Sequence, residues 1–424
     1  MRLFPGLAAL CVATSVFGGT FDGVWQITVT RFGEPSYSRA TIEASGEKLS
    51  GQFDAMALEG TAHGEAVAFT VRQSDGKVYG DFKGSTIEGV LVGTAKLNDE
   101  MVSWTAQKVG ERPVGAPKTH RFFPRTFQRE FSSGIAPVMH VYPGDSVTTS
   151  TIDADGMDSS GKRRLPGPNP LTGPFYIENA WPGDTLVVHF TRIRMNRNSA
   201  FQSHALVGNA LNPDYFKDLK PVEKFDSEWK LDREHSVATL KNPTEKLKNL
   251  SIKLAPMLGC VGVAPPGRSA IESTYPGSFG GNMDYNQVRE GVTLYFPVYH
   301  PGALLFVGDG HAAQGDAELT GDALETSMDV EFSVDVLQGQ SINMPRAENI
   351  EFLMAIGIGN SLEDALQAAT TNMAQWLERD YKLDSAEVAM VLTTSMRYDI
   401  AEIVDPRVNL VAKVPKSVLS ALRQ

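Results

Sequence analysis

Alternating apolar and polar residues dominate the first quarter of the chain. Short runs with a period of two residues recur roughly every eight to twelve positions, and glycine-containing turns separate them. Evenly spaced short strands of this kind are typical of a small antiparallel barrel or rolled sheet. A ligand-binding barrel and a packed accessory domain both fit this pattern. We therefore predict a separate β domain over residues 20–110, with strands over 23–29, 38–44, 48–53, 66–71, 77–82, 85–89 and 102–106.

The rest of the chain, residues 127–424, also contains alternating strands but adds helices near its end. A proline-rich and basic segment, residues 111–126, is typical of a linker between the two parts. Alternation is clear over 328–337, whereas Ser361 can cap a helix over 361–379 whose apolar residues fall on one face. The predicted fold class is therefore α+β and predominantly β: a small antiparallel barrel followed by a larger β-rich domain with C-terminal helices.

Residues 256–318 combine short apolar strands with polar, glycine-rich corners. The corners at 277–284 and 308–318 flank strands that the pattern predicts over 294–298 and 303–307. Glycine lets a backbone bend sharply or approach a ligand closely. The stretch is therefore the main candidate for a functional site.

The second corner gathers groups that bind divalent metals. Asp309, His311, Asp316 and Glu318 lie within ten residues, and carboxylate oxygens and imidazole nitrogens are ligands that such metals use. One interpretation is a metal-assisted hydrolytic site. The other is ordinary turn chemistry, because Asp-Gly pairs form turns in which Asp bonds its own backbone. The concentration of these four side chains favours the site.

Two carboxylates nearer the N-terminus extend the set of candidate ligands. Asp153 and Glu178 lie in or beside predicted strands, where a buried carboxylate must be paired, hydrogen-bonded or bound to metal. Both are candidate metal ligands, with an ordinary salt bridge as the alternative. Asp145 and Asp184 each follow Pro-Gly and are interpreted as turn residues. Glu325 is a further, less well placed candidate.

Composition and the N-terminus limit the functional classes. The 424 residues include 39 basic and 50 acidic ones, a net charge of −11, which argues against nucleic acid or an anionic membrane surface as the main partner. Residues 1–19 are typical of a signal peptide, with one positive charge before an apolar run. No later segment reaches the roughly 18 apolar residues needed to span a bilayer. We expect an exported protein, periplasmic or extracellular.

Several motifs carry a family resemblance. They are Gly259–Pro265 (GCVGVAP), Gly280–Asp284 (GGNMD), Pro301–Ala303 (PGA) and Gly308–Asp316 (GDGHAAQGD), with Tyr142–Asp145 and Thr172–Glu178 upstream. In these motifs the chain resembles the acetamidase/formamidase family over most of residues 127–424. It departs from the family pattern at Ala317, where glycine is expected, and in its N-terminal region. That region resembles small lipocalin-like domains attached to exported bacterial enzymes.

The resemblance implies a hydrolase that cleaves the C–N bond of small aliphatic amides of the formamide or acetamide type. Ammonia and a carboxylate are the expected products. It also implies a divalent metal such as zinc, which lowers the pKa of a bound water and polarises the carbonyl. We assign ligation of this metal to Asp284 and His311, with Asp153 and Glu178 as additional ligands.

Proton transfer requires an acid or base close to the metal. We assign catalytic roles to Asp309, His311 and Glu318, with Asp309 or Glu318 as the general base. The candidates for binding the substrate are Asn282 and Gln314, through hydrogen bonds to the amide, and Phe279, as a wall of the pocket.

Two other functions remain open. Cys260 lies in a glycine-rich motif and could act as an amidase nucleophile, although a buried structural cysteine is the simpler interpretation. Alternatively, the protein binds a small ligand without turning it over. No GxSxG motif is present, which argues against a serine hydrolase. The C-terminal helices either cap the sheet or form an oligomer surface, and we expect a homo-oligomer.

Overall fold

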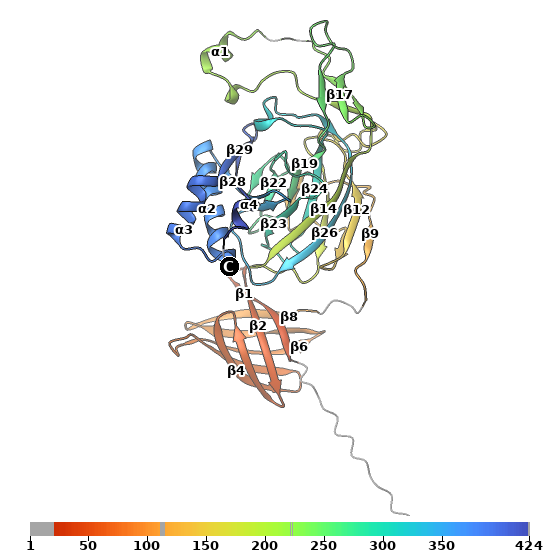
Figure 1. The fold of residues 1–424 in the computed structure, drawn as a ribbon. Helices are drawn as coiled ribbons and strands as arrows, with labels where there is room; N and C mark the ends of the chain where they lie inside the picture. Colours follow the sequence, from red (N-terminus) through yellow and green to blue (C-terminus); the bar gives the residue numbers. More distant parts are fainter. Residues whose placement is uncertain (1–20, 111–114, 221, 223, 423–424) are drawn as a thin grey trace, which may run out of the picture. The chain divides into compact units, whose positions relative to one another are not determined.

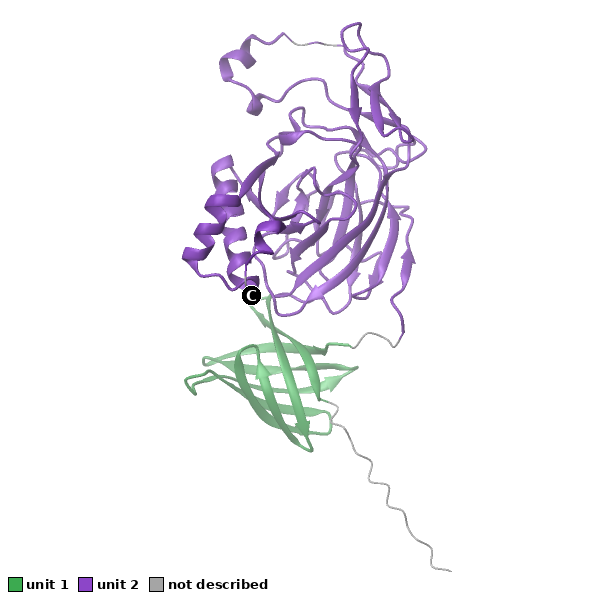
Figure 2. Cartoon of the chain, in the orientation of Figure 1, with its two compact units in different colours: residues 1–111 green, residues 112–424 purple. Residues whose placement is uncertain are grey.

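The computed structural model describes residues 21–110, 115–220, 222 and 224–422. The chain forms two compact units, residues 1–111 and 112–424, which are described separately (Figure 2). The predicted signal peptide, residues 1–19, lies outside the described residues, so export stays a prediction. Within the described residues, no helix has both the length and the apolar character needed to cross a membrane.

The first unit is a closed barrel of antiparallel strands in sequence order, in which β1 pairs with both β2 and β8 (Figure 1). The predicted barrel is confirmed. The pattern missed β4 and β7, and it divided the single strand β6 into two, over 77–82 and 85–89. In β4 only Leu58 and Ala62 are fully buried, so the apolar signal of that strand is weak. The strands are β1 (Gly23–Arg31), β2 (Glu34–Ser45), β3 (Lys48–Phe53), β4 (Met56–His63), β5 (Ala66–Arg72), β6 (Val78–Ile87), β7 (Val90–Leu97) and β8 (Glu100–Lys108).

Aromatic rings fill the barrel interior. Phe69 and Phe82 stack with ring centroids 4.8 Å apart, and Trp104 meets each of them edge-on at 5.7 Å. Phe53 packs against Phe82 at 5.3 Å, and all four side chains are buried. These rings occupy the space that a ligand would need. The packing therefore favours the accessory-domain interpretation of the barrel.

The second unit is built on two large sheets, with helices packed against one of them (Figure 1). The predicted β-rich domain with C-terminal helices is confirmed. Described helical segments are α1 (Pro213–Asp218), α2 (Leu362–Asp380), α3 (Ser385–Ser395), α4 (Lys416–Leu419) and the 3-10 turns η1 (Gly208–Ala210) and η2 (Asp316–Glu318).

One sheet has the strand order β18-β17-β16-β15-β25-β24-β19-β22-β21, with β13 pairing with β24 and β11 with β13. A separate pair, β10 and β20, lies outside it. The bounds are β10 (Glu130–Ser132), β11 (Met139–Val141), β13 (Leu171–Ile177), β15 (Ser199–Phe201), β16 (Glu228–Asp232), β17 (Val237–Leu240), β18 (Ser251–Lys253), β19 (Met257–Gly262), β20 (Ala270–Glu272), β21 (Pro276–Gly277), β22 (Gly280–Asn282), β24 (Leu305–His311) and β25 (Glu325–Thr326).

The other sheet has the order β29-β30-β28-β27-β23-β14-β26-β12-β9. Strand β9 lies inside the predicted linker and pairs in parallel with β12, so this part of the segment belongs to the sheet. The bounds are β9 (Thr119–Arg121), β12 (Ser146–Ser150), β14 (Thr185–Met195), β23 (Thr293–Pro297), β26 (Met328–Leu337), β27 (Arg346–Glu348), β28 (Phe352–Gly359), β29 (Arg397–Glu402) and β30 (Val408–Pro415).

Helix α2 packs closely against strand β28. Ser361 caps the helix by accepting a hydrogen bond from the backbone N–H of Asp364, as the sequence predicts. Gly357 of β28 faces the helix, and a Cβ there would collide with the backbone of Ala365 and Ala369. The absence of a side chain at Gly357 therefore allows this approach of helix to sheet.

Replacing Gly357 tests that packing. Gly357→Ala is expected to lower the free energy of unfolding by about 1–3 kcal/mol, because the added methyl group overpacks the contact between β28 and α2. Urea unfolding followed by circular dichroism measures the change. Gly110→Ala is the control, since a Cβ at Gly110 would meet no atom within 4 Å. Equal, small effects of the two substitutions would contradict the close packing.

Candidate active site and metal centre

Strand β24 carries Asp309 and His311 into the interior of the second unit. All seven of its residues, Leu305–His311, are buried. Pairing with β19 and β25 continues through His311, so the prediction of a corner at residues 308–311 is wrong. Alternate residues of a strand point to the same side, which brings the two side chains together.

Gly259 of β19 makes room for the site. Its neighbours in the strand place it opposite Asp309, because Leu258 pairs with Gly310 and Cys260 with Gly308. A Cβ at Gly259 would collide with carboxylate oxygens of both Asp284 and Asp309. The two carboxylates therefore occupy the space that a side chain would fill.

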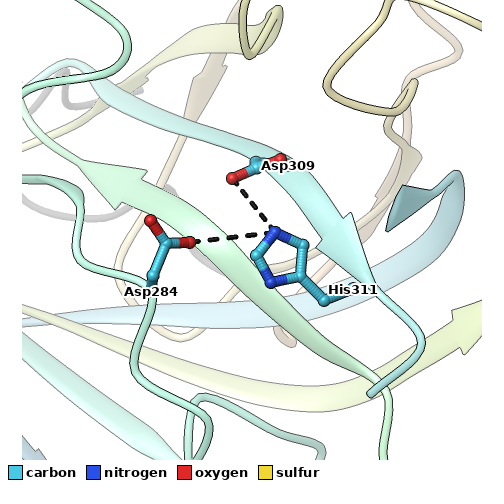
Figure 3. A group of neighbouring side chains, drawn as sticks. All are labelled: Asp284, Asp309 and His311. Carbon is cyan, nitrogen blue, oxygen red and sulfur yellow. Dashed lines mark ion pairs between the residues drawn. The ribbon is translucent and has the colours of Figure 1, made fainter. Parts of the chain in front are cut away.

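Four carboxylates surround the Nε2 atom of His311. Figure 3 shows Asp284 and Asp309, whose nearest oxygens lie 3.8 Å and 3.3 Å from Nε2. Glu325, which pairs with His311 across β24 and β25, lies 3.2 Å away, and Glu318 lies 4.0 Å away. All five side chains are buried. The fold thus brings together four of the residues predicted from the sequence: Asp284, Asp309, His311 and Glu318.

Gln314 fixes the orientation of His311. The Gln314 Nε2 atom donates to the backbone carbonyls of Asp284 and Ala401, at 2.6 Å and 3.2 Å. Its Oε1 atom is therefore the acceptor toward His311 Nδ1, 2.8 Å away. In the neutral ring, the proton lies on Nδ1 and the lone pair of Nε2 faces the carboxylates, which is the arrangement of a metal-binding histidine.

Several buried oxygens of the cluster have no hydrogen-bond partner in the part of the chain that the structure describes. Among the described residues, Asp284 Oδ1, Asp309 Oδ1 and Glu325 Oε2 are buried and accept no hydrogen bond. Buried polar atoms are almost always satisfied, and unsatisfied ones indicate a missing ion or water. The sets Asp284–Asp309–His311 and His311–Glu318–Glu325 each offer ligand atoms within 4.8 Å of one another. The donor set therefore fits a divalent cation.

Burial and mutual repulsion change the titration of these groups. Burial is the largest cause that raises the pKa of Asp284 and Glu325 well above the ordinary range, and it raises the pKa of Glu318 to about 8. Burial lowers the pKa of His311, but the Glu325 and Asp309 carboxylates outweigh it, so this pKa lies well above its usual value. The cluster thus retains protons unless a cation takes their place.

The backbone is strained where it presents the cluster. Asp284, Asp309 and Glu318 have φ values of 40°, 56° and 47°, and such positive values in residues other than glycine concentrate at functional sites. Ala317, where the family resemblance leads us to expect glycine, has φ 70°. Glycine adopts such a positive φ angle without steric strain, which explains why the family pattern has glycine at this position.

Asn282 lies at the centre of a network of side-chain hydrogen bonds. Its Oδ1 atom accepts from Cys260 Sγ at 2.5 Å and from Asn169 Nδ2 at 3.0 Å. Its Nδ2 atom donates to Asp284 Oδ2 at 2.6 Å and to Asp405 Oδ2 at 2.7 Å. An amide has two donor hydrogens and one acceptor oxygen. Asn282 therefore positions Asp284 in this structure, and its contact with a substrate stays a prediction.

The other two predicted substrate contacts, Gln314 and Phe279, stay predictions, and both side chains have protein contacts. Gln314 uses its side chain to orient His311, as described above, although it also lines the cavity beside the site. Phe279 is buried in the hydrophobic core, with its ring 5.2 Å from that of Phe131. A core position explains Phe279 without a pocket.

Asp153 and Glu178 do not join the cluster. Asp153 is buried, but it pairs with Arg197 at 2.5 Å and accepts from the backbone N–H of Met157 at 2.7 Å. Glu178 is partly exposed and lies 2.8 Å from His140. Asp153 thus has the ion pair that was the alternative interpretation, and Glu178 has a hydrogen-bond partner in His140.

The sequence interpretation missed two acidic residues that the fold places near the cluster. Burial raises the pKa of Asp405 to about 7 and that of Glu402 to about 9. Glu402 is the last residue of β29 and Asp405 lies in the turn that leads to β30, more than 80 residues after Glu318 in the chain. Their only signal in the sequence is that Val404–Asp405 lies in the closing segment of the family resemblance.

A cavity of about 580 Å³ borders the cluster. Glu318 is the member of the cluster that lines it, together with Gln314. A small molecule in this cavity would therefore meet the cluster at Glu318 first.

Comparisons with known proteins agree with this geometry. Residues 267–420, which include Asp284, Asp309, His311, Glu318 and Glu325, match the Acetamidase/Formamidase family. The chain is 24% identical over 232 residues to the formamidase of Methylophilus methylotrophus, covering 42% of this chain and 56% of that one. It is 27% identical over 194 residues to a Schizosaccharomyces pombe protein named provisionally as a formamidase, covering 35% and 47%. The chain thus spans about half the length of the curated relatives that it matches.

Solved structures extend the similarity to most of the second unit. The acetamidase of Yersinia enterocolitica has a TM-score of 0.61 and 26% identity, with 74% of this chain and 95% of that chain covered. The acetamidase of Bacillus halodurans has the same score and identity, with 72% and 100% covered. The fold around the cluster is therefore that of these acetamidases.

The raised pKa values predict how stability depends on pH when no metal is bound. Glu318, Asp405 and Glu402 have folded pKa values of about 8, 7 and 9, whereas an unfolded carboxyl titrates near about 4. The folded state therefore binds more protons between these limits, and stability falls as the pH rises.

We expect the urea midpoint of chelator-treated protein to fall steadily from pH 5 to pH 8. Glu402→Gln should reduce this slope, because the amide oxygen can still accept from the N–H groups of Val404 and Asp405 but does not titrate. A midpoint that rises over this range would contradict the buried, proton-binding cluster.

Proposed function

We propose that this chain, a relative of the acetamidase/formamidase family in sequence and in fold, is a metal-dependent amidase that releases ammonia and a carboxylate from primary amides. One observation carries the proposal: buried carboxylates surround His311 Nε2, several of their oxygens accept no hydrogen bond from any described residue, and Glu318 borders a cavity. The similarity to formamidases and acetamidases supports the choice of reaction.

His311, Asp309, Asp284 and Glu325 are the groups that would hold the metal. One imidazole nitrogen and several carboxylate oxygens form a donor set suited to zinc. A divalent cation there supplies Lewis acidity toward the amide carbonyl and lowers the pKa of a water molecule. Gln314 keeps His311 Nδ1 protonated, so Nε2 is available as a ligand.

Glu318 is assigned the proton transfers because it lines the cavity. Hydrolysis adds the oxygen of a water molecule to the carbonyl carbon and breaks the C–N bond. Glu318 accepts a proton from the attacking water and donates it to the departing nitrogen, which leaves as ammonia. The acyl group leaves as a carboxylic acid, which then transfers its proton to ammonia or to water and becomes a carboxylate. In this proposal Asp309 is a metal ligand. Glu318 is the general base, the role for which the sequence left Asp309 and Glu318 as alternatives.

The thiol alternative has little support from the position of Cys260. The side chain is buried, and its Sγ lies 2.5 Å from Asn282 Oδ1 and 3.2 Å from the carbonyl of Ser273. Burial and the nearby carboxylates raise the pKa of Cys260 well above its usual value, so the group stays a thiol. A nucleophilic cysteine needs the opposite shift.

A pair of carboxylate substitutions tests the metal site. We expect Asp284→Asn to lose most of the bound metal and to lower kcat/KM for acetamide by at least about 100-fold, because Asp284 lies beside His311 Nε2. Glu178→Gln, which alters a carboxylate outside the cluster, should keep both. Elemental analysis and ammonia release measure the outcome. Metal loss in Glu178→Gln, or full retention in Asp284→Asn, would contradict the ligand assignment.

The role of Cys260 is tested by Cys260→Ser. Since a serine hydroxyl can still donate to Asn282, the variant should keep kcat/KM within about tenfold of the parent protein. Thiol-alkylating reagents should leave the native enzyme active. Complete loss of turnover in the well-folded, metal-loaded variant would shift the mechanism to the thiol.

A further inference from the structure

Exposed apolar side chains gather around the cavity that borders Glu318. Leu206, Leu250, Ile252 and Leu319 line it and have exposed fractions of 44%, 37%, 36% and 43%. They come from distant parts of the chain: the loop after β15, the region of β18, and the residue after η2. Large aliphatic side chains brought together at one hollow, instead of scattered singly, are typical of a ligand-binding groove.

The hollow continues away from the cluster. A second cavity of about 380 Å³ shares Leu206, Leu250 and Trp229 with the first and extends to Phe225 and Leu247. Trp229 lines both cavities, and its indole Nε1 has no hydrogen-bond acceptor among the described residues. The two cavities therefore lie next to each other along shared, mainly apolar walls, and we refer to them together as the channel, which borders Glu318.

This channel is large for formamide or acetamide. The cavity beside Glu318 alone, at about 580 Å³, falls in the range of about 300–1,000 Å³ typical of sites for much larger ligands. The four heavy atoms of acetamide need only on the order of 100 Å³, at about 30 Å³ for each water-sized group. Most of the apolar wall would remain in contact with water if acetamide were the substrate.

We propose that the preferred substrates are amides with an extended apolar substituent, which lies along Leu206, Leu250 and Ile252 while the amide group reaches Glu318. This inference rests on the proposed amidase function and names its substrate class. Transfer of one methylene from water to an apolar wall favours binding by up to about fourfold. Partial burial of a phenylalkyl group should therefore change kcat/KM by more than tenfold.

The test compares three amides on the metal-loaded, full-length protein. They are acetamide, 4-phenylbutanamide, with the apolar group on the acyl side, and N-(3-phenylpropyl)acetamide, with it on the nitrogen. We expect one of the two larger amides to exceed acetamide at least tenfold in kcat/KM, measured by release of ammonia or amine. The larger amide that is preferred identifies the side of the scissile bond that faces the channel. Acetamide turned over as well as both others would overturn the inference.

Two leucines of similar exposure provide the variant and its control. Leu250→Asn should reduce the ratio of kcat/KM for the preferred large amide over that for acetamide by at least threefold, because it places an amide in the apolar wall. Leu366→Asn changes a leucine of α2 that is 40% exposed and does not line either cavity. It should leave the ratio unchanged, and equal effects of both variants would overturn the inference.

Binding separates this inference from the proposed reaction. If no amide is hydrolysed, but calorimetry detects saturable binding of 4-phenylbutanamide that Leu250→Asn weakens, the amidase proposal fails and the apolar site stands. Absence of both hydrolysis and binding overturns the inference. Light scattering could instead reveal an oligomer that Leu250→Asn dissociates, with no preference for large amides. That result would assign the apolar side chains to a contact between copies of this chain and would overturn the inference.

Discussion

The concentration of buried negative charge around His311 is the constraint on which the second unit depends. Carboxylates within about 4 Å of one ring nitrogen repel each other and lose hydration, and either penalty alone costs several kcal/mol in a protein interior. Such a cluster persists only with bound protons or a bound cation. His311 Nε2 and carboxylate oxygens without hydrogen-bond partners among the described residues face one another, and this is the arrangement that we propose binds a cation.

Backbone conformation, more than side-chain packing, positions the groups of this cluster. Gly259 leaves the space that two carboxylates occupy, and positive φ angles turn Asp284 and Asp309 toward one another. Asn282 connects Asp284 to the distant Asp405, so the strands of one sheet and the closing turn of the other hold the site together. Positioning at this level is what a preorganised catalytic site requires.

The sequence predicted most of the architecture and the centre of the site. Regular alternation identified the barrel, and the dense motif around Asp309 and His311 identified the cluster. Sequence-based prediction failed where the decisive contact is between residues far apart in the chain. Asp405 comes near the cluster only in the folded protein, and Arg197, the partner of Asp153, lies 44 positions away from it. Local sequence also does not reveal the hydrogen bonds that Asn282 makes to Asp284 and Asp405.

The central claim is that a divalent cation occupies the buried cluster. The most direct test is the anomalous scattering of crystals of the protein purified without chelators, collected on both sides of the zinc absorption edge. The account predicts one strong peak within about 2.0–2.2 Å of His311 Nε2 and of carboxylate oxygens from Asp309 and its neighbours. A catalytically active crystal form with no peak in the cluster at any transition-metal edge would contradict the account.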